Sequence, residues 1–89
     1  MNVYAKASEV IAKYGHNKGD SGDQHRGYCL LGALHVADPN QDFHIPTAAR
    51  RVTDTAGIRQ VAHMFNDNPS TTKADVLRAL DITARKYSK

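Results

Sequence analysis

The sequence has little cysteine and no long hydrophobic run. A single cysteine, Cys29, among 89 residues excludes a disulfide within the chain and a cysteine-rich zinc site. No apolar stretch approaches the roughly 18 residues that cross a bilayer. The N-terminal segment carries Glu9 and lacks the apolar stretch of a signal peptide. We therefore expect a cytoplasmic protein with no membrane partner.

A large excess of charge of one sign is also missing. Twelve Lys and Arg residues stand against nine Asp and Glu residues, which gives a net charge of +3. The basic residues of the C-terminal half, residues 46–89, are interspersed with aspartates, whereas nucleic-acid-binding faces are usually more uniformly basic. With 40% hydrophobic and 24% charged residues, the composition predicts one globular domain over residues 1–89.

Hydrophobic periodicity predicts an all-α fold, a compact bundle of roughly four to five short helices around a buried central helix at about residues 28–37. That segment is apolar nearly all round, and its scarcity of β-branched residues favours a helix over a buried strand. Its small residues Gly32 and Ala33 would let another helix approach closely. The other helices are expected over residues 2–14, from Pro46 to Gly57, over residues 58–65 and from Thr72 to Tyr87.

Local signals mark the ends of two of these helices. Thr72 is a favourable N-cap, and Asp75 stands three residues later, as in a capping box. Pro69 follows Asn66-Asp67-Asn68 and cannot continue a helix, so the preceding helix must stop there. We therefore interpret both polar clusters as helix-end signals.

The connections between the helices are less well defined. Phe43 and Ile45 are expected to anchor the segment before Pro46 onto the core. Residues 15–27 contain four glycines and no large apolar side chain, which predicts a flexible surface loop that is either functional or mobile. Whether residues 46–67 form one kinked helix or two stays open.

Two motifs occur together in this chain. Residues 29–34 read Cys-Leu-Leu-Gly-Ala-Leu, and Asn66-Asp67-Asn68-Pro69 precedes Thr72, Asp75 and a Val-Leu pair. Together they resemble a family of small, functionally uncharacterised actinobacterial and actinophage proteins. The chain departs from that family at Phe65, where a tryptophan is common. The resemblance implies a helical fold and a bacterial or phage setting, and it implies no activity.

Residues with catalytic or metal-binding chemistry are present but do not form a recognised pattern. Cys29, His63 and Asn66 can be drawn as nucleophile, base and orienting amide, but apolar surroundings should keep the Cys29 thiol unreactive. His25 and Cys29 are the only pair with metal-ligand spacing, and zinc needs three or four ligands. The glycine-rich loop lacks the ending of a phosphate-binding loop and the final Glu of an EF-hand. We expect no enzymatic activity, no cofactor and no metal.

Nucleic-acid binding through the basic helical region 46–67 is the alternative that stays open. This region is expected to read helix, glycine turn and helix, with Arg50, Arg51 and Arg59 available for phosphates. Thr53 and His63 stand where a helix-turn-helix motif usually carries apolar residues that hold its two helices together. The pattern therefore only partly fits a DNA-binding motif.

The sequence as a whole favours a small non-enzymatic module that binds a cellular protein, or a host protein if the chain is phage-encoded. The expected contact residues are His16, Lys18, His25 and Arg26 in the glycine-rich loop, together with the basic residues Arg50, Arg51 and Arg59. A homodimer is a further expectation if apolar side chains such as Met64 or Tyr87 are exposed.

Overall fold

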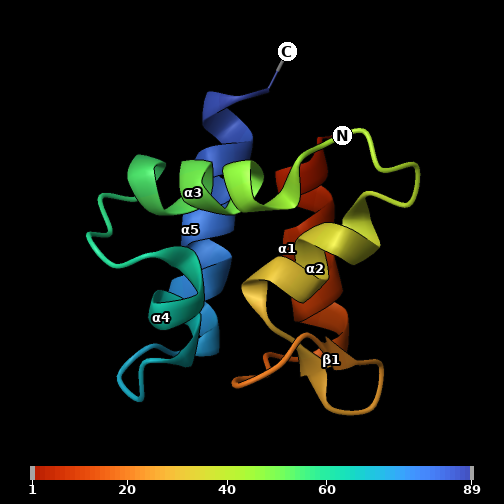
Figure 1. The fold of residues 1–89 in the computed structure, drawn as a ribbon, viewed down its shortest axis with the longest axis vertical. Coiled ribbons are helices and arrows are strands. Elements are labelled where there is room, and N and C mark those ends of the chain that lie inside the picture. The colour runs from red at the N-terminus through yellow and green to blue at the C-terminus, as the bar shows by residue number, and fades with distance from the viewer. Residues whose placement is uncertain (1, 89) are drawn as a thin grey trace.

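A computed structural model describes residues 2–88, which form five helices and one short hairpin (Figure 1). The two longest helices, α1 and α5, run side by side in opposite directions, and α2 and α3 cross in front of them (Figure 1). The elements are α1 (Val3–Tyr14), β1 (Gly22–Asp23), β2 (Gly27–Tyr28), α2 (Leu30–Ala37), α3 (Ile45–Thr55), α4 (Ala62–Asp67) and α5 (Lys73–Lys86). The fold is thus mostly helical, with one small antiparallel pair of strands.

Local sequence signals account for α1 and α5. The Asn2 side chain accepts a hydrogen bond from the Ala5 amide at the start of α1, and it also donates to the Ala84 carbonyl, which ties α1 to the end of α5. The expected capping box at the start of α5 is confirmed, because Thr72 and Asp75 exchange hydrogen bonds between side chain and backbone. Capping therefore fixes where both long helices begin.

The central segment is confirmed as the middle of the core, but it begins later than expected. Leu30, Ala33 and Leu34 are fully buried, whereas Val36 is 45% exposed, so α2 is amphipathic rather than apolar all round. Tyr28 belongs to β2 and not to the helix, because its backbone pairs with Gly15 and Asn17 in an extended conformation. The expected helix over residues 28–37 is therefore wrong in its first two residues.

The predicted helix over residues 58–65 is wrong in its first four residues, because α4 begins only at Ala62 and ends at Asp67. Gly57 turns the chain with φ of +72°, a conformation that glycine adopts readily, and the Ile58 amide then bonds to the Thr53 carbonyl at 2.8 Å. Residues 58–61 leave this turn without helical structure, so Val61 is 56% exposed instead of buried. Region 46–67 thus holds two helices with a loop between them.

Residues before α3 are placed only partly as expected. Ile45 is buried and is the first residue of α3, with Pro46 in the first turn, where the missing amide hydrogen costs nothing. Phe43 is 41% exposed and does not anchor the connection to the core. The buried Asp38 carboxylate instead holds this connection by accepting hydrogen bonds from the amides of Asp42 and Phe43.

The glycine-rich segment 15–27 lies against the rest of the molecule and contains β1 and part of β2. Gly32 was expected to admit a neighbouring helix, but its close neighbour is this segment. A Cβ atom on Gly32 would overlap the carbonyl oxygen of Ser21. The Cys29 amide also donates a hydrogen bond to the Ser21 carbonyl, at 3.2 Å, and this bond holds the segment in place.

None of the helices within residues 2–88 is long and apolar enough to cross a membrane.

The contact at Gly32 makes a first prediction. Ala is a better helix former than Gly by about 1 kcal/mol, yet Gly32→Ala should lower the free energy of unfolding by about 1–3 kcal/mol because its methyl group meets the Ser21 backbone. Urea denaturation measures the effect. His35→Ala, on the exposed side of the same helix, is the control and should not destabilise the protein. A Gly32→Ala protein as stable as the wild type would contradict the tight packing of this segment.

Candidate functional site

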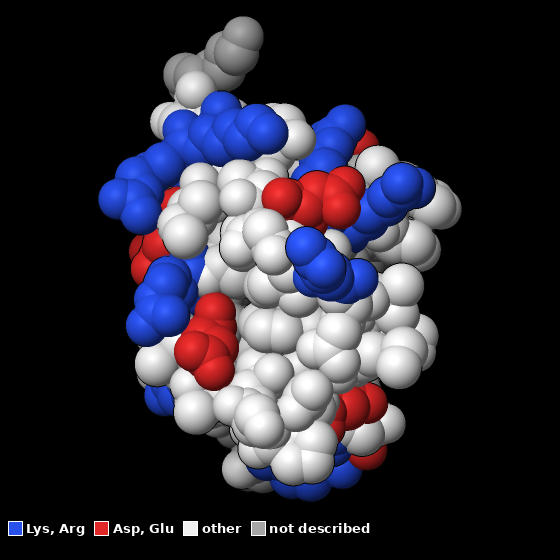
Figure 2. Space-filling model, turned by 90° about the vertical axis from the view of Figure 1, so that its left-hand side faces the viewer, with Lys and Arg blue, Asp and Glu red and all other residues white. Residues whose placement is uncertain are grey.

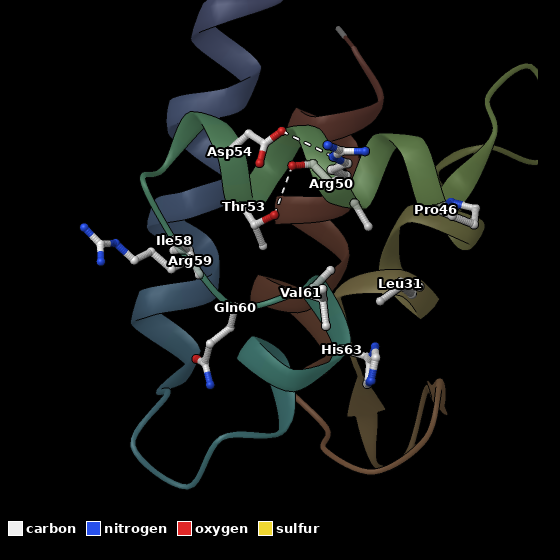
Figure 3. Close-up of a pocket in the computed structure, with 12 residues that line it drawn as sticks. Leu31, Pro46, Arg50, Thr53, Asp54, Ile58, Arg59, Gln60, Val61 and His63 are labelled. Carbon is white, nitrogen blue, oxygen red and sulfur yellow. Dashed lines mark hydrogen bonds and ion pairs between the residues drawn. The ribbon is translucent and has the colours of Figure 1, made fainter.

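A hollow of about 490 Å³ opens between α3 and α4 (Figure 3). We call it the α3–α4 groove. Its apolar lining comes from four parts of the chain, namely α2, α3, the 56–61 loop and α4. These apolar residues are Leu31, Pro46, Ala49, Ile58, Val61 and Ala62. The groove exists because the non-helical residues 58–61 separate the two helices, so α4 does not close against α3.

One apolar side chain of the groove lining is strongly exposed. Val61 is 56% exposed, whereas Met64 on α4, which is 54% exposed, is not part of the lining. In Figure 3, Val61 lies below α3, and the side chains of Leu31 and His63 lie to the right of it. Apolar surface gathered around a concave site is typical of places where another molecule binds.

Charged groups at the groove are mainly basic. The Arg50 guanidinium lies 3.7 Å from the Asp54 carboxylate, and the two side chains are 83% and 68% exposed, so this ion pair contributes little to stability. Arg59 extends outward from the 56–61 loop (Figure 3) and joins none of the ion pairs within residues 2–88. Figure 2 shows a broad uncharged area on the side of the molecule that it presents, with both basic and acidic side chains along its upper and left-hand borders.

Of the expected contact residues in the glycine-rich loop, three bind within the chain. The Lys18 ammonium donates to the Asn68 carbonyl. His16 contacts the side chain of Asn66, with 2.6 Å between Nε2 and Oδ1. Arg26 forms ion pairs with two aspartates of its own loop at 3.0 and 3.1 Å. His25 alone among the four is exposed without such a contact in the described chain.

The ion pairs of Arg26 affect both aspartates. Its guanidinium hydrogen bond is the main cause that lowers the pKa of Asp20. At Asp23 the largest effect comes from the backbone amide of Arg26, followed by that of His25, and these also lower the carboxyl pKa. Two carboxylates thus surround the single guanidinium of Arg26 in this loop.

The expected basic face is divided by the structure. Arg50 and Arg59 both line the α3–α4 groove. Arg51 instead lies over the ring of Tyr87, 5.3 Å from the ring centroid, next to the end of α5. The structure thus brings only two of the seven expected contact residues to the groove. The groove itself was missed, because its apolar residues were assigned to a buried helical stripe.

Asn66 is the residue whose role sequence reasoning missed most clearly. It was expected to act in ending its own helix, yet it is only 1% exposed and joins three separate segments. Its Oδ1 accepts from the Leu30 amide at 3.0 Å and from His16 Nε2 at 2.6 Å. Its Nδ2 donates to the Asn17 carbonyl and to the Asp67 carboxylate, both at 3.0 Å. We call this set of contacts the Asn66 node.

The node caps a neighbouring helix. Leu30 is the first residue of α2, and its amide has no partner inside the helix. Asn66 therefore supplies from α4 the acceptor that this amide needs. An amide oxygen can only accept hydrogen bonds, so His16 Nε2 is the donor in its contact with Asn66 Oδ1. Asp67 extends the node by accepting a hydrogen bond from the Gly19 amide at 2.9 Å.

Two of the three residues drawn as a catalytic set, Cys29 and Asn66, hold other hydrogen bonds. Cys29, His63 and Asn66 border one small hollow of about 190 Å³. Cys29 is 8% exposed, and its Sγ caps α2 by accepting from the Gly32 amide at 3.2 Å. All four of the Asn66 hydrogen bonds described above are structural. The absence of enzymatic activity stays a prediction.

The structure also places the His25–Cys29 pair, which has metal-ligand spacing, and the partial helix-turn-helix pattern. His25 is exposed in the hairpin turn, whereas Cys29 is buried. No three His, Cys, Asp or Glu side chains within residues 2–88 gather closely enough to hold a metal ion. In the region 46–67, Thr53 is buried and donates to the Arg50 carbonyl at 3.0 Å, and the second helix, α4, has only six residues.

Comparison with known proteins identifies one family. Residues 1–86 match DUF6197, which is described as a family of unknown function. No curated protein and no solved structure matches the chain.

The Asn66 node makes a second prediction. Asn66→Ala leaves the Leu30 amide and the Asn17 carbonyl without their partner, so the free energy of unfolding should fall by about 2–4 kcal/mol. Chemical denaturation measures it. Asn40→Ala, at an exposed position, removes the same side chain and should change stability by less than about 0.5 kcal/mol. Equal stability of the two variants would show that the node is not structurally important.

The node also predicts a dependence on pH. The Gly19 amide, followed by the Asn66 side chain, lowers the pKa of Asp67 from its usual value of 3.8. A carboxyl whose pKa is lowered by folding stabilises the fold above pH 3.8, and this contribution is lost as the pH falls through the folded-state pKa. Acid titration of the unfolding free energy should therefore show a smaller loss in Asp67→Asn than in the wild type. An identical loss in both proteins would contradict this assignment.

Proposed function

Because this chain belongs to the DUF6197 family of unknown function, we propose its function from its own geometry: it is a non-enzymatic module that binds another protein through the α3–α4 groove. The single observation that carries the proposal is the exposed apolar surface at this groove. Val61, which lines the groove, remains more than half exposed in a chain whose core is small.

The local sequence supports this role for the 56–61 loop. Val61 is the N-cap of α4, a position where Ser, Thr, Asp or Asn would stabilise the helix and valine does not. An exposed valine at this position therefore stabilises neither the helix end nor the core. Contact with a partner is the benefit that we assign to it.

The setting that we propose follows from the motif resemblance and not from the geometry. Residues 29–34 and the Asn66–Pro69 turn resemble actinobacterial and actinophage proteins. We therefore place the protein in the cytoplasm of such a bacterium, where a phage-encoded copy would act on a host protein.

Binding of nucleic acid by the region 46–67 is the alternative. Arg50, Arg51 and Arg59 are all exposed in this region and favour it. Against it, Asp54 lies beside Arg50, and Arg51 is drawn away toward Tyr87. The groove beside Arg50 and Arg59 is lined largely by apolar side chains, which form no hydrogen bonds with phosphate. Protein binding therefore accounts for more of this surface.

A selection experiment tests the proposed function. A random peptide library displayed on phage, selected against the native protein, should yield peptides whose binding is lost on Val61→Ser. Serine is a favourable N-cap, so α4 should persist while the apolar contact disappears. We expect the affinity of selected peptides, measured by fluorescence polarisation, to fall by at least about tenfold, or about 1.4 kcal/mol.

Val36→Ser is the matched control, since Val36 is also an exposed valine but lies on α2 away from the groove lining. It should leave the affinity unchanged. A selection without binders, or binders that both substitutions weaken equally, would overturn the proposed function. Binding of a DNA duplex that falls steeply with salt and is insensitive to Val61→Ser would favour the alternative.

A further inference from the structure

The lining of the α3–α4 groove also indicates the chemistry of its partner. We infer that the groove takes an acidic peptide segment that carries one bulky apolar side chain, which enters between α3 and α4 while flanking carboxylates bind Arg50 and Arg59. This inference rests on the proposed function and adds the class of partner to it.

The size and lining of the groove favour a bulky apolar side chain in the bound segment. Its volume of about 490 Å³ lies within the roughly 300–1,000 Å³ of sites that enclose small ligands. Ala49 and Ala62, which line the groove together with Leu31 and Ile58, are small and leave room for a side chain of the partner. A leucine or phenylalanine side chain would displace water from this surface, and such an anchor usually dominates binding energy at interfaces.

The two guanidiniums at the groove favour carboxylates in the bound segment. Arg50 forms an ion pair with Asp54 at 3.7 Å, and both groups are exposed to solvent. Because this pair is weak, Arg50 can bind a carboxylate of the partner instead. Arg59 has no ion-pair partner within residues 2–88 and already projects from the loop (Figure 3). Two guanidiniums against one carboxylate leave a net positive groove, and arginine binds carboxylates through two parallel hydrogen bonds.

Other basic groups of the chain do not offer the same combination. Arg26 and Lys18 are bound to other parts of the chain, as described above. A second hollow of about 400 Å³, between α1 and α2, is bordered by Lys6 and Lys13, but Glu9 lies between them on the same helix. The α3–α4 groove differs from this hollow because its basic groups are arginines, which bind carboxylates through two parallel hydrogen bonds.

A second copy of this chain is the other occupant to be tested. The exposed pair Asp42 and Phe43 has the chemistry that the groove would accept. Such a contact would join different surfaces on the two copies and would not close into a dimer. A symmetric contact would instead bring the arginines of two positively charged grooves together, which is unfavourable. We therefore assign the groove to a different protein.

The test uses two fluorescent peptides of equal length, each with a central phenylalanine, one flanked by glutamates and the other by lysines. The acidic peptide should bind the wild-type protein, weaken at higher salt, and weaken at least about tenfold with Arg59→Glu. The lysine peptide should not bind the wild type and should gain affinity with Arg59→Glu. Arg85→Glu, an equal change of net charge on α5, is the control and should leave both peptides unaffected.

The outcomes separate this inference from the proposed function. If the library selection succeeds but its peptides are neutral or basic, or if Arg59→Glu and Arg85→Glu act alike, the acidic partner is wrong while protein binding at the groove stands. If no peptide of any composition binds, the proposed function fails. If light scattering shows self-association that Phe43→Ser abolishes, the groove belongs to a second copy and the inference is overturned.

Discussion

The structure depends on one buried amide side chain. Asn66 has too little contact with water to satisfy its polar atoms there, so it must find hydrogen bonds within the protein. It finds them on the first amide of α2 and on the glycine-rich loop. A buried polar group is specific about its neighbours, because a displaced partner leaves it unsatisfied at a cost of about 1–3 kcal/mol. Asn66 therefore determines where three segments meet.

The proposed binding surface follows from this constraint. Asn66 belongs to α4, so the node that holds α2 and the loop also holds α4 at one end of the molecule. At the other end of the connection between α3 and α4, the turn at Gly57 ends α3 and redirects the chain. Residues 58–61 span the distance between these fixed points without forming a helix, so Val61 stays exposed while Ile58 packs partly against the core. The groove is thus a consequence of how α4 is anchored.

Much of the fold was predictable because its signals are local. Pro46 and Thr72 mark helix starts whatever the rest of the chain does, and both predictions are confirmed. The helix predicted to begin at Ile58 was wrong, because the spacing of Ile58 and Val61 is also that of a helix. The turn at Gly57 prevents a helix here, and this turn depends on a hydrogen bond to α3. The node was not predictable, since Asn66 and Leu30 are 36 residues apart and no sequence pattern records their contact. The groove was missed for the same reason, because it depends on the position of α4.

Native-state hydrogen exchange at the Leu30 amide tests the central claim most directly. Its hydrogen is bonded to the Asn66 side chain and not to a helical carbonyl, so its protection reports on the node itself. If the node holds the fold together, this hydrogen exchanges only when the whole protein unfolds, with the same free energy as the Ala33 amide inside α2. Exchange at Leu30 with a much lower free energy than at Ala33 would show that the node opens while the fold persists, and would contradict the account.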